Sequence, residues 1–271
     1  MSVASATSAA FGLGERSRTV LCMIGGPYVV RDGRRLDVPE GCKRLVVFVA
    51  LHGGRVDRRQ AAGALWPNGD DERAMGNLRS ALWRLRRARI DVLTADMAAL
   101  ALCDEIDVDV TRLFDWAGRL IDGTIQPSDL RVSPISLEAV DLLPGWYDDW
   151  VIFERERLRQ RLLHGLEALS RQLRLLRRWS EAVEAAMTAV NMEPLRESAQ
   201  YVLAEAHVAE GNLVEARRCF SAYRALLLAE LGIEPSQDLI SLVQYGCVEV
   251  PNSVVKGSRG NGAMLSPAFG S

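Results

Sequence analysis

The sequence lacks the features that identify most enzymes and metalloproteins. Its five cysteines are odd in number, lie far apart and never form a CxxC pair, which argues against both a disulfide framework and a zinc site. The three histidines are scattered as widely. No P-loop, GxGxxG, GxSxG or HExxH motif occurs. We therefore expect no enzyme, no metal site and no cofactor.

Long hydrophobic runs are also missing. No stretch reaches the roughly 18 consecutive apolar residues that a membrane-spanning helix needs. Residues 1–10, rich in Ala and Ser, lack the basic and apolar regions of a secretory signal. We expect a cytoplasmic protein without membrane contact. Residues 1–17 and the Pro-, Asn-, Ser- and Gly-rich residues 251–271 are predicted to be disordered.

The composition is that of a folded protein with room for two domains. Hydrophobic residues make up 48% and charged residues 25% of the 271 positions, a typical globular balance. The net charge of -2 hides an asymmetry, because residues 1–107 carry a net +3 and the remainder a net -5. Such a division is compatible with a nucleic-acid-binding domain joined to a protein-interaction module.

The front half has the element order of a winged helix-turn-helix. Apolar and β-branched runs separated by turn residues predict a small sheet over residues 19–38. Three helices follow at residues 43–51, 57–66 and 71–89, the second with Asp57 as its N-cap. A hairpin of two strands comes next, at residues 92–95 and 98–103. In this fold the third helix enters the major groove of DNA. The acidic residues 104–109 lack an EF-hand pattern and are expected to form a solvated linker.

The helix at residues 71–89 carries the candidate functional site. At 100° per residue, an apolar face is formed by Leu78, Ala81, Leu82 and Leu85. Five arginines and no acid lie between positions 79 and 89. Guanidinium groups suit phosphate oxygens and the O6/N7 edge of guanine. An arginine-rich helix alone is often only a solvated surface, but the winged-helix context favours DNA binding. The predicted DNA-binding residues are Asn77, Arg79, Ser80, Trp83, Arg84, Arg86 and Arg87.

The rear half is predicted to be entirely helical. Its first long helix has a leucine stripe spaced by three and four residues: Leu158, Leu162, Leu166, Leu169, Leu173 and Leu176. The pair Glu181–Ala182 recurs 34 residues later as Glu215–Ala216. Thirty-four residues is the period of a tetratricopeptide-like helical hairpin, which buries its apolar face by stacking on a neighbour. We expect Trp146, Tyr147 and Trp150 to anchor the first hairpin on the winged helix, rather than to bind a ligand.

Several motifs together resemble one family. They are ALWP at 64–67, NLRSALWRLRR at 77–87, LLPGWYDDW at 142–150, ERERL at 154–158, EGNLVEA at 210–216 and ELGIEP at 230–235. In this order they are similar to the Streptomyces antibiotic regulatory protein (SARP) regulators. These proteins couple an OmpR-type winged helix to a bacterial transcriptional activator domain of tetratricopeptide-like helices. The resemblance spans roughly residues 19–245.

The resemblance implies a DNA-binding transcriptional activator. It places the winged helix at residues 18–107 and the activator domain at residues 108–250. It further implies a homodimer on repeated promoter sites that recruits RNA polymerase through its sigma or alpha subunit, in the cytoplasm at the nucleoid. The family's recognition-helix pattern puts Trp83 and Arg84 toward bases and Arg86 toward phosphate. The wing departs from the family, since its tip at residues 96–100 has neither Gly nor Arg.

The sequence also allows two other functions. The chain could be a tetratricopeptide-like scaffold whose basic front domain docks on an acidic protein instead of DNA. It could also keep the DNA-binding domain and use its helical half to sense a ligand or a partner, because a superhelical groove suits peptides.

Overall fold

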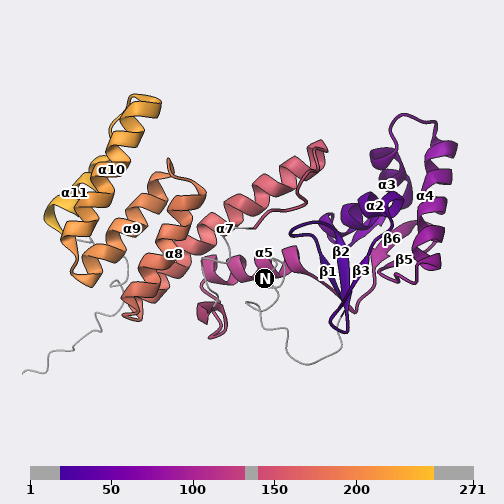
Figure 1. The fold of residues 1–271 in the computed structure, drawn as a ribbon, viewed down its shortest axis with the longest axis horizontal. Helices are drawn as coiled ribbons and strands as arrows, with labels where there is room; N and C mark the ends of the chain where they lie inside the picture. The colour runs from indigo at the N-terminus through magenta and orange to yellow at the C-terminus, as the bar shows by residue number, and fades with distance from the viewer. Residues whose placement is uncertain (1–18, 132–139, 247–271) are drawn as a thin grey trace, which may run out of the picture.

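The computed structural model describes residues 19–131 and 140–246, so the tails expected to be disordered lie outside the described residues. A mixed part of strands and helices forms one end of the molecule, and a stack of helices extends away from it (Figure 1). The predicted fold class is confirmed, with a winged helix-turn-helix followed by tetratricopeptide-like helices. None of the helices in the described part is long and apolar enough to cross a membrane.

The described residues begin with a strand of a four-stranded sheet, whose order is β3-β2-β1-β7. Its strands are β1 (Thr19–Cys22), β2 (Tyr28–Arg31), β3 (Arg34–Asp37) and β7 (Ile106–Val108). The turn between β2 and β3 is two residues long, and both Asp32 and Gly33 have positive φ angles, of 51° and 72°. Such a turn matches the right-handed twist of the two strands.

Three helices follow β3 and pack on one another: α2 (Glu40–Leu51), α3 (Arg58–Leu65) and α4 (Asp71–Arg87). The predicted N-cap of α3 is confirmed, since the Asp57 carboxylate accepts the backbone N–H of Arg59 and of Gln60 at 2.8 and 3.0 Å. The helix ends at Trp66 before Pro67, because a residue before proline avoids the helical conformation. The turn that follows leads into α4.

A second sheet, ordered β4-β6-β5, forms the wing. Its strands are β4 (Arg55–Asp57), β5 (Leu93–Ala95) and β6 (Ala99–Leu102). The hairpin of β5 and β6 was predicted, whereas β4 was not. This three-residue strand directly precedes α3 and pairs with β6 through Val56 and Leu100.

The acidic run at residues 104–109 is not a solvated linker, and that prediction was wrong. β7 lies within the run and pairs in parallel with β1, with Val20 opposite Asp107. Asp109 then turns its carboxylate back onto the end of β1, where it accepts the backbone N–H of Met23 and Ile24 at 2.9–3.0 Å. The carboxylate satisfies donors that the strand leaves unpaired, so the run closes the sheet.

The helical half begins directly after β7. Its elements are α5 (Asp109–Ile121), the 3-10 turn η1 (Asp129–Arg131), α7 (Asp149–Leu175), α8 (Trp179–Met192), α9 (Glu197–Glu210), α10 (Leu213–Leu231) and α11 (Gln237–Tyr245). The 34-residue repeat is confirmed, because Trp179 and Leu213 start equivalent helices and both Ala182 and Ala216 are fully buried. The leucine stripe is buried except at Leu176, which is 51% exposed because α7 ends one residue before it.

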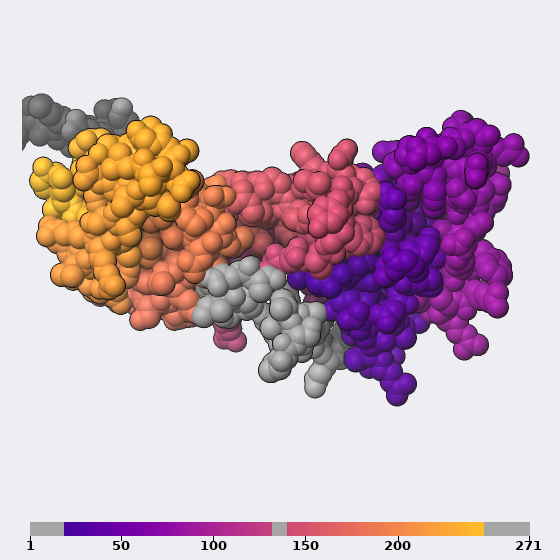
Figure 2. Space-filling view, turned by 45° about the horizontal axis from the view of Figure 1, so that its top comes forward, coloured from indigo at the N-terminus to yellow at the C-terminus, as the bar shows by residue number. Residues whose placement is uncertain are grey.

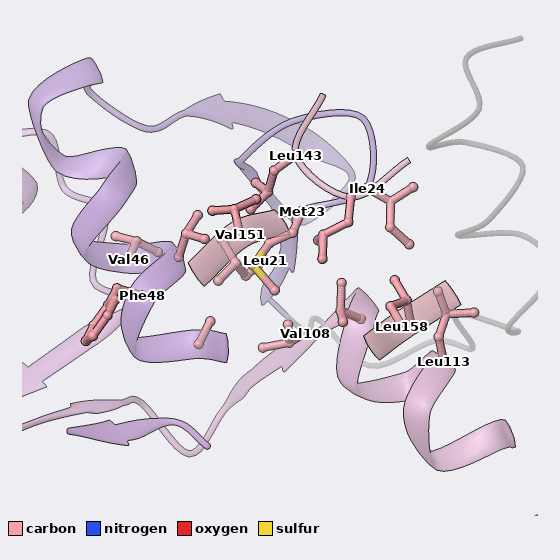
Figure 3. Packing of buried hydrophobic residues seen from close by; sticks show 14 of the residues in the cluster. Leu21, Met23, Ile24, Val46, Phe48, Val108, Leu113, Leu143, Val151 and Leu158 are labelled. Carbon is pink, nitrogen blue, oxygen red and sulfur yellow. The ribbon is translucent and has the colours of Figure 1, made fainter. Parts of the chain in front are cut away.

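The two halves share one hydrophobic core. Figure 3 shows Leu21, Met23 and Ile24 of the first half packed among Leu113, Leu143, Val151 and Leu158 of the second. Two backbone hydrogen bonds reinforce the contact, from Gly25 N–H to the carbonyl of Asp141 and from Leu143 N–H to that of Met23, at 2.9 and 3.0 Å. The halves are therefore joined by a packed interface.

The predicted aromatic anchor is confirmed at two of its three positions. The ring of Trp150 meets Phe48 of α2 edge-on with 5.4 Å between centroids, and Trp146 lies edge-on to Trp150 at 6.5 Å. Tyr147 is 81% exposed and takes no part in the anchor, which corrects that prediction. It falls between the two tryptophans, in the extended segment before α7, and its side chain points to solvent.

Asp109 predicts a specific pH dependence of stability. Burial raises its pKa to about 6, although the backbone N–H groups of Ile24 and Met23 oppose the shift. A carboxyl group whose pKa is higher in the folded state favours folding when protonated, so this contribution is present below about pH 4 and is lost as the pH rises through 6. In urea denaturation at pH 4.5 and 7.5, Asp109→Asn should remove this contribution. Identical pH dependence in the variant and the parent would contradict the assignment.

Candidate nucleic-acid interface

Helix α4 lies at the outer edge of the winged helix, at the end of the molecule away from α8–α11 (Figure 1). Its inner face is buried against α2 and α3 through Leu78, Ala81, Leu82 and Leu85, the four positions that the sequence pattern predicts. In the space-filling view of Figure 2, the purple segment that contains α4 is at the opposite end from the orange and yellow helices. The outer face of α4 is therefore open.

The seven predicted DNA-binding residues all lie on this open helix. Every one of them is exposed: Asn77, Arg79, Ser80, Trp83, Arg84, Arg86 and Arg87. Trp83, an apolar ring, is 58% exposed, and the Arg87 guanidinium lies over it at 5.2 Å. The structure thus brings an aromatic ring and several guanidinium groups to one surface, which we call the arginine face. Its contact with DNA stays a prediction.

The arginine face carries charge that the described chain does not neutralise. Within residues 19–131 and 140–246, no carboxylate lies within 4 Å of the guanidinium groups of Arg79, Arg84, Arg86 or Arg87. The acids of α4 are at its other end, where Asp70 caps the helix by accepting the N–H of Arg73 at 2.8 Å. Acids at the start of a helix and arginines at its end interact favourably with the helix dipole, so both stabilise α4.

Helix α2 supports the arginine face from behind. The Cys42 thiol donates to the carbonyl of Ala81 at 3.3 Å, and burial raises the pKa of that thiol. The guanidinium of Arg84 crosses α2 at Gly41, where a Cβ atom would lie only 2.3 Å from Arg84 Nη1. A glycine at this position thus leaves room for the side chain of Arg84. Sequence reasoning missed this role of Gly41, because the two residues are 43 positions apart.

The wing acquires arginines from outside its own hairpin. Arg58 donates to the backbone carbonyl of Asp96 at 2.8 Å, and Arg55 lies 3.4 Å from the Asp96 carboxylate. That carboxylate also accepts the N–H groups of Ala99 and Ala98, which are the largest causes that lower its pKa. Met97, at the tip, is fully exposed. The arginine that the wing lacks in sequence is supplied in space by β4 and α3.

The described residues offer little for metal or redox chemistry. Among residues 19–131 and 140–246, no three His, Cys, Asp or Glu side chains are grouped so that they could hold a metal ion. The cysteines in these ranges, at positions 22, 42, 103 and 219, are free thiols. The chemistry that the arginine face can perform is the binding of anionic, hydrogen-bonding surfaces.

Comparison with known families finds a match in the rear half. Residues 137–245 match the family model of the bacterial transcriptional activator domain. The helices α7 to α11 thus resemble a bacterial transcriptional activator domain. The match includes the two tetratricopeptide-like hairpins and the tryptophan anchor, and α5 and η1 lie between it and the winged helix. The predicted resemblance to SARP-type transcriptional regulators is thereby confirmed for this half.

Comparison with solved structures extends the likeness across both halves. The fold resembles that of Mycobacterium tuberculosis EmbR, which was solved in complex with a low-affinity phosphopeptide, with a TM-score of 0.63 and 19% sequence identity. The match covers 85% of this chain and 65% of that chain, which is just under two thirds of its length. No curated protein matches the chain. The fold of a winged helix followed by a stack of helices is thus shared by the two proteins.

Proposed function

We propose that this protein regulates transcription by binding promoter DNA through the arginine face of α4. The observation that carries the proposal is the open, unpaired arginine face on the third helix of a winged helix-turn-helix. In this fold the third helix lies in the major groove. The activator domain behind it supports a role in transcription and gives no support to catalysis.

We further propose a division of labour on α4. Arg84 and Trp83 reach toward base edges, where a guanidinium group forms two hydrogen bonds with guanine. Arg86 and Arg87 contact phosphates, which fixes the position of the helix on the duplex but does not read the sequence. Asn77, Arg79 and Ser80 lie one to two turns earlier and complete the contact surface.

The wing gives a prediction of its own. Because Arg55 and Arg58 flank the wing tip, we expect the wing to contact the DNA backbone beside the groove that holds α4. Arg58→Gln should lower the affinity for any duplex and reduce the slope of log affinity against log salt by about 1. Arg35→Gln, on the β2–β3 hairpin, is the matched control. An unchanged slope for Arg58→Gln in fluorescence-anisotropy titrations would exclude the wing from the interface.

We assign to the activator domain the contacts with other proteins. We propose that it mediates dimerisation on repeated sites and contacts RNA polymerase, through the sigma or alpha subunit, to activate transcription at the nucleoid. The shared core supports this assignment, because it holds the activator domain in a defined orientation relative to α4. A partner bound to the helical half would then be positioned relative to the promoter.

A genome-wide footprint of the bound protein tests the proposal. We expect peaks upstream of genes, each containing a repeated motif, and gel shifts of those fragments by the purified chain. Adding RNA polymerase in a purified transcription assay should then increase transcript from the same fragments. Peaks without a common motif, together with fragments that fail to shift, would contradict sequence-specific binding.

A further inference from the structure

A hollow between α5 and α7 is lined by charged side chains, two of which form no ion pair within the described residues. Its volume is about 470 Å³, and it is lined by Phe114, Asp115, Arg157, Gln160, Arg161 and His164. This volume is within the range of pockets that hold small molecules. The hollow lies on the activator-domain side of the shared core and is separate from the arginine face.

Two opposite charges line the hollow without pairing. Asp115 and Arg161 make no hydrogen bond or ion pair anywhere in residues 19–131 and 140–246. Asp115 acts electrostatically on Arg119, but the guanidinium of Arg119 is bonded to Asp129 at 2.7 and 3.0 Å. An unpaired cation and an unpaired anion facing one space suit a ligand that carries both charges.

The other polar groups of the hollow are mostly engaged. Gln160 donates to Glu156 at 2.8 Å and accepts from Arg196 at 3.0 Å. Arg157 lies 3.3 Å from Glu154, with its guanidinium over the ring of Phe114 at 5.1 Å. These contacts leave Asp115, Arg161 and His164 as the groups available to a ligand, whereas the ring of Phe114 is covered by Arg157.

Gly118 brings the two charges close together. The guanidinium of Arg161 crosses α5 at this glycine, where a Cβ atom would lie 2.8 Å from Nη2. Asp115 is three residues earlier on α5, and residues at this spacing have Cβ atoms about 5–6 Å apart. The cation and the anion are thus about one helical turn apart, with Phe114 beside them.

We propose that this hollow binds a free α-amino acid. Its carboxylate would accept two hydrogen bonds from Arg161 and its ammonium group would donate to Asp115. A purely anionic ligand would meet Asp115 and a purely cationic one Arg161, so the pair of charges selects a zwitterion. The inference does not depend on DNA binding.

Calorimetric titration of the full chain tests the ligand class. We expect L-phenylalanine to bind, and we expect N-acetyl-L-phenylalanine and L-phenylalaninamide, which each lack one charge, to bind at least about tenfold more weakly. Equal binding of the zwitterion and its two derivatives, or no binding of L-phenylalanine, would overturn the proposal.

Variants test the position of the site. Asp115→Asn and Arg161→Gln should each weaken L-phenylalanine binding by about tenfold or more. Asp122→Asn, just after α5, and Arg177→Gln, just after α7, are matched exposed controls that should bind as the parent does. Because all four substitutions are of solvent-accessible side chains, folding should be unaffected, which circular dichroism verifies. If Asp115→Asn and Arg161→Gln bound L-phenylalanine as well as the controls do, the binding site would not be in this hollow.

Discussion

Arg84→Ala should weaken binding to the natural promoter site by about 1–3 kcal/mol, or roughly 5- to 150-fold in Kd. The loss is large because one guanidinium group supplies two hydrogen bonds to a guanine edge, and alanine replaces neither. The preference for guanine at one position of the site should relax at the same time. Gel-shift titrations with the natural site and with single-base variants of it measure both effects.

Substitutions of the neighbouring arginines should have a different effect from that of Arg84→Ala. Arg86→Ala and Arg87→Ala should weaken binding to all sequences alike and each reduce the salt slope by about 1, because phosphate contacts carry no sequence information. Arg35→Ala, an exposed arginine paired with Asp37 outside the arginine face, should leave binding unchanged. If Arg84→Ala kept full affinity for the natural site, the assignment of base recognition to Arg84 would be wrong.

Leu143→Ala should destabilise the whole chain by about 2–5 kcal/mol, the usual cost of removing a fully buried leucine side chain. Leu143 lies in the shared core, so the loss should affect both halves in one transition. Urea denaturation followed by tryptophan fluorescence and by circular dichroism measures it, and coincident curves would indicate cooperative unfolding.

Leu176→Ala is the matched control for this variant. The same substitution at a leucine that is 51% exposed, just after α7, should change the free energy of unfolding by less than about 0.5 kcal/mol. Two separate transitions in the parent, with Leu143→Ala shifting only one of them, would contradict a core shared by both halves.

The sequence was sufficient to predict the elements with strong local patterns. The apolar positions of α4 recur every three to four residues, so its buried and open faces follow from periodicity alone. The 34-residue offset likewise predicted that Trp179 and Leu213 begin equivalent helices. All seven predicted interface residues are exposed because they fall on the opposite side of the same helix or on its flanks.

Features that depend on contacts distant in sequence could not be predicted in this way. β7 is short and acidic, and it is a strand only because β1, more than 80 residues earlier, offers it a parallel partner. The arginines beside the wing tip come from β4 and α3, about 40 residues before Asp96. Gly41 of α2 leaves room for the guanidinium of Arg84, which comes from α4. No local pattern of residues indicates such approaches.

The dependence of duplex DNA affinity on salt tests the central claim most directly. Titrating the full chain with a random-sequence duplex between 50 and 200 mM salt should give a steep negative slope of log affinity against log salt, about -0.9 for each phosphate that an arginine neutralises. With Arg86, Arg87 and Arg58 assigned to phosphates, we expect a slope of roughly -3. A slope near zero would show that this face does not bind nucleic acid.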